Sequence, residues 1–153
     1  GSFADDRGES SRWIGSIRGP LGNPLYTLEG TAPVSQLVAA AFARGLQERG
    51  LLADPAGGVY LLSGRIEELG GNRYVRSEAR ARIRVMVTER QTGRELFANT
   101  YTAVNEKPGA LAVGGDATSG IEELRGLVAD TLHQVAAQAL DDPNLRAALR
   151  AAP

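Results

Sequence analysis

The sequence predicts an α+β domain in which two main helices pack on one face of an antiparallel sheet of three or four strands. Apolar residues recur every three or four positions over residues 33–49 and 121–140, which is the spacing of helices with one buried stripe. Between these segments, residues 73–88 alternate apolar and charged side chains, the pattern of a strand with one solvated face. Because the strands lie between the helices in the chain, both helices can cover the same face of the sheet.

The first helix is predicted over residues 33–49. Pro33 suits its first position, because the N–H that proline lacks would have no intrahelical partner there. Thr31 is placed to cap the helix, since a threonine hydroxyl can accept from the free N–H groups of the first turn. Gly50 follows the last turn and suits the left-handed residue that commonly ends a helix.

Three strands of a meander are predicted after the first helix. They run over residues 59–69, 73–88 and 95–104, with tight turns at Gly70-Gly71-Asn72 and at residues 90–93. The phase of the third strand is open. Either Leu96, Thr100 and Val104 point inward and Phe97 and Tyr101 outward, or the reverse holds.

A second long helix is predicted over residues 121–140. Ser119 and Glu122 have the spacing of a capping box, in which each side chain accepts from the backbone N–H of the other. An acidic turn stops this helix, and Asp142 is expected to cap a last short helix around Leu145.

Composition narrows the classes of function. The chain has 153 residues, which suits one domain, and 17 Lys and Arg against 18 Asp and Glu. Balanced charge argues against a nucleic-acid binder that depends on bulk electrostatics. The absence of cysteine removes disulfides and thiolate chemistry. No apolar run approaches the roughly 20 residues that cross a bilayer.

Several spacings then occur together. They are the run Val34–Val38 followed by Phe42, Leu46 and Gly50, the Gly71–Asn72 hairpin followed by Tyr74, the strand Ala79–Val87, the strand end Asn99–Asn105, and helix 121–140 closed by an acidic turn and the short helix Leu145–Leu149. Over roughly residues 33–150 this pattern resembles the YajG-like family of bacterial envelope lipoproteins. The resemblance implies a protein that is exported, lipidated at an N-terminal cysteine and tethered on the periplasmic side of a bacterial membrane, with the outer membrane expected.

Two features depart from that family. The chain holds no cysteine, so the lipid anchor is an expectation about what precedes it in the natural protein. The segment Trp13–Leu28 has no close match in the family pattern. Residues 1–32 are broken by glycine and proline, and we expect an irregular segment packed on a single α+β domain over residues 33–150.

Two surfaces are candidates for binding. An apolar N-terminal segment covers the core, pairs as a short strand or meets a partner, and a ladder of arginines on the second strand is either a solvated face or an anion-attracting surface. The candidate residues are Trp13, Ile14, Ile17, Leu21 and Tyr26 in the segment, Arg80, Arg82 and Arg84 in the ladder, and Phe97 and Tyr101 beside it. Glu67 is expected to lie near the arginines.

No catalytic, metal or cofactor site is predicted. His133 is the only histidine and has no nucleophile or carboxylate at useful spacing. Asp5-Asp6 lacks the pattern of a calcium loop, and the glycines of residues 114–120 lack the lysine of a phosphate loop. The function expected is therefore a non-enzymatic adaptor or accessory of the cell envelope that contacts protein or lipid, with a homodimer through a sheet edge as an option. The alternative is a carrier of a small lipid in a cleft between helices and sheet.

Overall fold

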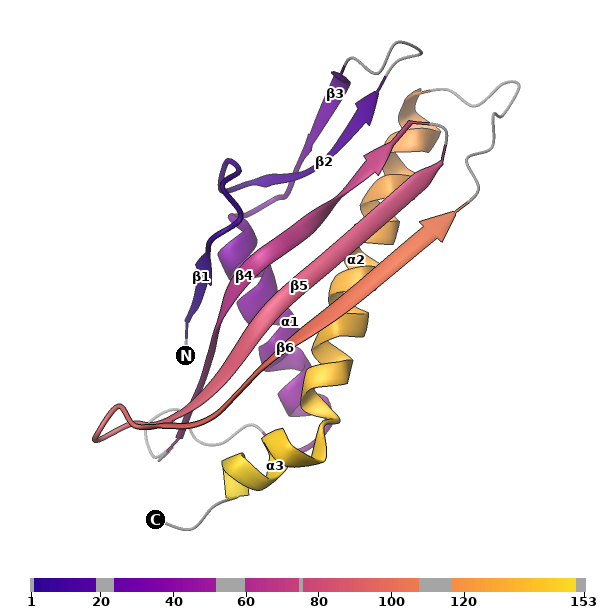
Figure 1. The fold of residues 1–153 in the computed structure, drawn as a ribbon. Coiled ribbons are helices and arrows are strands. Elements are labelled where there is room, and N and C mark those ends of the chain that lie inside the picture. The colour runs from indigo at the N-terminus through magenta and orange to yellow at the C-terminus, as the bar shows by residue number, and fades with distance from the viewer. Residues whose placement is uncertain (1, 19–23, 52–59, 75, 108–116, 151–153) are drawn as a thin grey trace.

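The computed structural model describes residues 2–18, 24–51, 60–74, 76–107 and 117–150 (Figure 1). In chain order the elements are β1 (Phe3–Asp5), β2 (Trp13–Arg18), β3 (Pro24–Glu29), α1 (Val34–Glu48), β4 (Tyr60–Arg73), β5 (Ser77–Glu89), β6 (Glu95–Lys107), α2 (Ala117–Leu140) and α3 (Pro143–Arg150). None of the helices in these described ranges is long and apolar enough to span a membrane.

The sheet is mixed and has six strands, so the prediction of three or four antiparallel strands is wrong in both count and type. The meander β4–β5–β6 is antiparallel, as predicted, and the strand order is β3-β2-β4-β5-β6. Strands β1 and β2 both pair in parallel with β4, at successive stretches of its free edge. These strands come from the N-terminal segment that was expected to be irregular. They are short, and β2 and β3 pair with register shifts, which hides the two-residue pattern.

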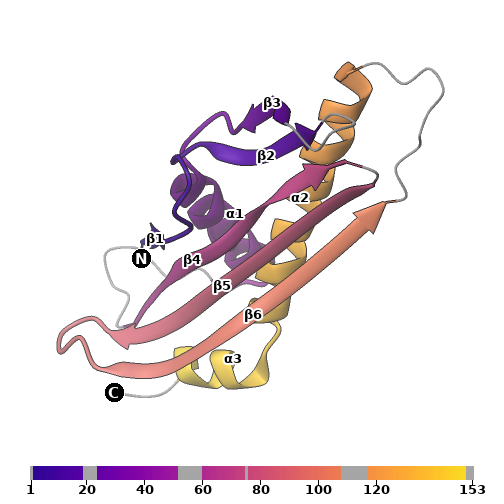
Figure 2. The same cartoon turned by 45° about the horizontal axis from the view of Figure 1, so that its top comes forward.

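Helices α1 and α2 lie on one face of the sheet, and no described helix covers the opposite face, which we call the open face (Figures 1 and 2). β5 shows the reason most clearly, because its alternate residues Ala79, Ala81, Ile83, Val85 and Val87 are all buried. Phe42 of α1 is also buried, and its ring lies 4.8 Å from that of Phe3 in β1. The predicted packing of two main helices on one face is therefore present.

The hairpin between β4 and β5 lies farther along the chain than predicted. β4 continues through Gly70 and Gly71 to Arg73, and the N–H of Tyr74 donates to the carbonyl of Arg76 at 3.3 Å. A Cβ at Gly71 would lie 2.7 Å from Leu124 of α2. Gly71 is therefore needed because α2 approaches the strand closely, and a turn is not the reason for it.

The other chain reversals agree better with the sequence. Gly50, after α1, and Gly93, in the β5–β6 turn, both have the positive φ that favours glycine, at 66° and 72°. The N-terminal caps were predicted less well. Pro33 is the N-cap residue of α1 and no side chain caps that helix, so the Thr31 cap is wrong. α2 begins at Ala117, which places Ser119 inside the helix instead of at a capping box.

Candidate binding surfaces

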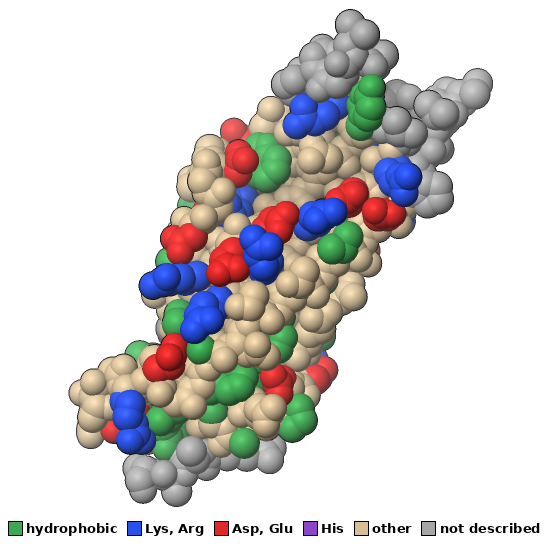
Figure 3. All heavy atoms as spheres, in the orientation of Figure 1, with side chains coloured by type: hydrophobic (Ala, Val, Ile, Leu, Met, Phe, Trp, Pro, Cys, Tyr) green, Lys and Arg blue, Asp and Glu red, His purple; other side chains and the backbone are tan. Residues whose placement is uncertain are grey.

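The predicted arginine ladder lies on the open face of the sheet. Figure 3 shows a band on this face in which basic and acidic side chains alternate. The arginines pair with glutamates of the same sheet: Arg80 with Glu78 at 2.5 Å, Arg82 with Glu67 at 3.0 Å and Glu68 at 3.5 Å, and Arg84 with Glu95 at 4.0 Å. The expected proximity of Glu67 is confirmed.

This pairing changes the chemistry expected of the face. The hydrogen bond from Arg80 lowers the pKa of Glu78 below its ordinary value, so that carboxylate stays charged beside its partner. Because four glutamates accompany the three arginines, the face carries both signs of charge. A partner that carries charges of both signs therefore complements this face better than a purely anionic partner does.

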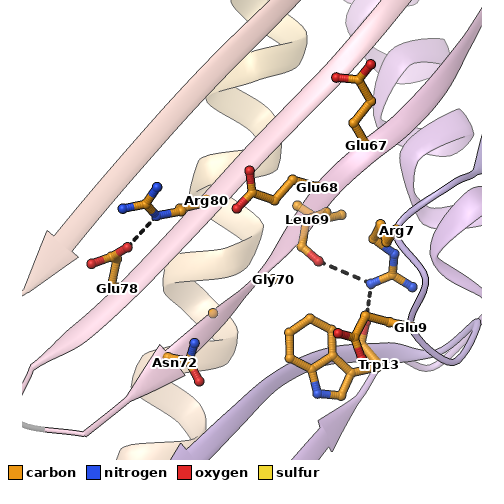
Figure 4. Close-up of a pocket in the computed structure, with 11 residues that line it drawn as sticks. Arg7, Glu9, Trp13, Glu67, Glu68, Leu69, Gly70, Asn72, Glu78 and Arg80 are labelled. Atoms are coloured by element: carbon orange, nitrogen blue, oxygen red, sulfur yellow. Dashed lines mark hydrogen bonds and ion pairs between the residues drawn. The ribbon is translucent and has the colours of Figure 1, made fainter.

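A polar groove opens beside the ladder, with a volume of about 340 Å³ (Figure 4). We call it the Trp13 groove. It is lined by Arg7, Glu9 and Trp13, by residues 67–72 of β4, and by Glu78 and Arg80 of β5. The Trp13 ring rests on Gly70, where any side chain would collide with it, and its indole N–H donates to Ser16 at 3.2 Å.

Arg7 connects the backbone segments that line this groove. Its side chain is 2% exposed. It forms a bidentate pair with Asp5 at 2.7 and 2.8 Å, and it donates to the backbone carbonyls of Trp13, Leu69 and Ser10 at 2.5, 3.1 and 3.0 Å. The hydrogen bond from Arg7 lowers the pKa of Asp5. Since its guanidinium is saturated by the protein, Arg7 positions the groove and does not offer itself to a ligand.

The Trp13 groove has the chemistry of recognition. Its glutamates of β4 and β5 form ion pairs with Arg80 and Arg82, and no nucleophile lies beside a base among the described residues that line it. Within the described ranges, no group of three His, Cys, Asp or Glu side chains is placed to hold a metal ion. An aromatic ring surrounded by exposed charges is typical of protein contact surfaces.

The N-terminal candidates divide between core and surface. Trp13 is half-buried and lines the groove, whereas Ile14 is 5% exposed and belongs to the core. Ile17 is partly buried against that core, and Tyr26 on β3 is 47% exposed. Leu21 lies outside the described residues. The segment therefore covers the core with β2 and leaves an aromatic side chain of β3 in solvent.

Phe97 and Tyr101 do not belong to the open face, which corrects their grouping with the arginines. Phe97 packs against the core and Tyr101 is 8% exposed, because in β6 these positions take the inward phase. The hydroxyl of Tyr101 donates to Asp142 at 2.6 Å, and Asp142 caps α3 by accepting from the N–H of Asn144 at 2.9 Å. The predicted Asp142 cap is therefore confirmed, and Tyr101 ties β6 to it.

Replacing Tyr101 by phenylalanine is expected to lower the free energy of unfolding by about 1–2 kcal/mol at pH 7, because a hydrogen bond to a carboxylate is lost. The Tyr101 hydrogen bond is the main reason that the pKa of Asp142 is lowered in the fold. A lowered carboxyl pKa gives stability above the unfolded value near pH 4, and this stability is lost as the pH falls through the folded pKa. Urea unfolding measures the free energy of unfolding at both pH values. The difference in this free energy between the variant and the wild type should therefore be smaller at pH 3 than at pH 7. An equal difference at both pH values would contradict the coupling.

Comparison with known proteins shows the fold alone. No family model and no curated protein matches the sequence. A Xanthomonas campestris protein of family DUF330 has a TM-score of 0.64 at 14% identity over 90% of this chain and 77% of that one. PelC of Paraburkholderia phytofirmans, solved as a dodecamer, has a TM-score of 0.52 at 15% identity, over 92% of this chain and 86% of PelC. A Caulobacter crescentus protein assigned to the lipoproteins has a TM-score of 0.51 at 16% identity, over 82% of this chain and 88% of that protein.

These similarities agree with the α+β fold that the sequence predicted. Proteins of family DUF330 and proteins assigned to the lipoproteins share this α+β fold. No match in sequence assigns the chain to the YajG-like family in particular.

Proposed function

We propose that this chain is the folded domain of a bacterial envelope lipoprotein, anchored on the periplasmic side of a membrane, that acts as a non-enzymatic accessory by binding another envelope protein. The fold likeness to a protein assigned to the lipoproteins supports the setting. The observation that carries the mode of action is the Trp13 groove, which joins a half-buried tryptophan to exposed charges of both signs on a helix-free face. Tryptophan and arginine are the side chains most enriched in the energetic centres of protein interfaces.

A protein partner fits this face better than a lipid surface does. Anionic head groups attract unpaired basic residues, but Arg80, Arg82 and Arg84 already face carboxylates. Glu9 adds a further exposed carboxylate at the groove. A partner with complementary charges of both signs can exchange these surface ion pairs at small cost, because exposed pairs contribute only about 0–1 kcal/mol each.

Self-association through the edge of the sheet is part of the proposal. β6 stands at one end of the strand order, and residues 96–105 within it carry no charged side chain. An uncharged edge strand is a favourable template for pairing with another strand. The dodecameric PelC shows that a protein of this fold can assemble with copies of itself.

Site-specific photocrosslinking in the natural host tests the proposal with the full-length protein. A photoreactive phenylalanine analogue at Glu67 or Arg80 should form an adduct with one and the same envelope protein, identified by mass spectrometry. At Val104 on β6, which is 44% exposed, it should give an adduct of twice the chain's mass. The exposed Ala43 of α1 is the matched control and should give neither adduct.

Charge reversal sharpens the test. Arg82→Glu should reduce the adduct at Glu67 about tenfold, the change expected when an interface loses roughly 1.4 kcal/mol. Trp13→Ala is less useful, because Trp13 also packs on Gly70 and Arg7. Adducts that form equally well at Ala43, or that survive Arg82→Glu, would refute the open face as the contact surface. Fractionation of the same cells should recover the protein with the envelope, and recovery from the cytoplasm would refute the location.

A further inference from the structure

A second groove lies between the two main helices, on the face of the sheet opposite the Trp13 groove. Its volume is about 370 Å³. The helices converge at the end of α1, where a Cβ on Gly45 would lie 2.5 Å from Leu140, and they diverge toward the start of α1 (Figure 1). Ala40 of α1 and Ala129 of α2 line the groove with short side chains, which leave space between the two helices. We call it the interhelical groove.

The interior of the interhelical groove is apolar. Ile14 of β2 and Leu69 of β4 line it from the sheet, Leu37 and Ala41 from α1, and Val128 and Leu132 from α2. Apolar surface of this kind gains free energy when a hydrocarbon chain displaces water from it. The volume lies at the lower end of the roughly 300–1,000 Å³ that is usual for small-molecule sites, which favours a single chain.

The rim of the groove is basic. Arg44, Arg125 and His133 line it, and none of its described lining residues is acidic. Among the residues that the structure describes, Arg44 forms one ion pair, with Glu48, its exposed neighbour on α1, at 3.2 Å. Arg125 donates to the carbonyl of Glu29 at 2.9 Å and has no ion pair with any residue in the described ranges. A guanidinium with free donors at the mouth of an apolar groove is complementary to a carboxylate at the end of a hydrocarbon chain.

We propose that the interhelical groove binds a single-chain anionic amphiphile, a fatty acid anion, with its chain along the walls from Leu37 to Leu132 and its carboxylate at Arg125. A lipid with two chains is too bulky for a groove of this volume, whereas a carboxylate with a single chain is not. The site lies on the other face from the Trp13 groove, so either can fail without the other. It goes beyond the proposed accessory role and gives the domain a ligand of its own.

Fluorescence titration of the purified chain tests the ligand class. The probe is 11-(dansylamino)undecanoate, whose emission rises and shifts to the blue in an apolar site, at concentrations below micelle formation. Dodecanoate should displace it, whereas dodecyltrimethylammonium, with the same chain and a positive head group, should displace it at least about tenfold less well. Absence of probe binding overturns the site, and equal displacement by the two head groups overturns the charge assignment.

Variants locate the binding. Ala129→Phe fills the groove from an exposed helix position and should weaken dodecanoate binding at least about tenfold. Ala43→Phe, at an exposed position of α1 that does not line the groove, is the matched control and should bind like the wild type. Ala40→Phe fills the groove from the other helix and serves if Ala129→Phe does not fold. A folded filling variant that binds dodecanoate like the wild type overturns the location.

A head-group variant completes the set. Arg125→Gln should weaken dodecanoate binding about fivefold to tenfold and reduce the preference for dodecanoate over dodecyltrimethylammonium. If dodecanoate binding stays at the wild-type level in this variant, Arg125 is not the carboxylate partner and that part of the proposal is wrong.

Discussion

Replacing Arg7 by methionine is expected to lower the free energy of unfolding by about 3–5 kcal/mol, the range for removal of one partner from a buried ion pair. The substitution leaves the Asp5 carboxylate, 17% exposed, without its partner. It also removes donors from the carbonyls of Trp13 and Leu69, which connect β2 and β4 to the segment that follows β1. Urea unfolding followed by circular dichroism measures the change.

The matched control is Arg80→Met. The pair of Arg80 with Glu78 is also short, but the side chain of Arg80 is 55% exposed. Its loss should therefore change the free energy of unfolding much less than the loss of Arg7 does, because an ion pair in solvent contributes little. Equal effects of the two substitutions would show that burial does not distinguish them, and the account of Arg7 as a structural clamp would be wrong.

Replacing Gly71 by alanine is expected to destabilise the protein by about 1–3 kcal/mol, because the added methyl group overpacks the interface between β4 and α2. Its Cβ would lie 2.7 Å from the Cδ1 of Leu124, and 3.0 Å from both the carbonyl oxygen of Glu78 and the Cγ2 of Val128. The backbone carbonyl cannot move aside without disturbing the β4–β5 ladder. Thermal and urea unfolding should both show the loss.

Gly126→Ala is the control with the opposite sign. Gly126 lies within α2, and a Cβ there would meet nothing within 4 Å. An alanine inside a helix is more favourable than glycine by about 0.5–1 kcal/mol, so this variant should be stabilised. If Gly71→Ala also stabilised the protein, the close approach of α2 to Gly71 would be refuted.

Much of the central fold could be predicted because its patterns are local. The alternation from Ala79 to Val87 placed β5 and its buried face, and the three- and four-residue spacing placed α1 and α2. The parallel strands β1 and β2 could not be predicted in this way. Their pairing with β4 joins Phe3 to Gly64 and Gly15 to Gly71, and contacts between such distant parts of the chain leave no periodic trace in short, glycine-broken segments.

Some residues of the candidate sites could likewise be predicted from local patterns in the sequence, and others could not. Alternation along β5 put Arg80, Arg82 and Arg84 on the solvated face, and the lone tryptophan marked the Trp13 groove. Arg7 was missed because the groups that saturate it come from residues 5, 10, 13 and 69. The interhelical groove was anticipated only as a general cleft between helices and sheet, since its walls need the crossing of α1 and α2 at Gly45.

The sequence by itself determined which side of β5, α1 and α2 is apolar, because the repeat of such an element imposes that choice residue by residue. Only the tertiary structure decided what the irregular positions do. Gly71 is an example, since a glycine that permits a turn and a glycine that makes room for a neighbouring helix are identical in sequence. The difference lies in which distant atoms approach the backbone, and that is set by the packing of the whole chain.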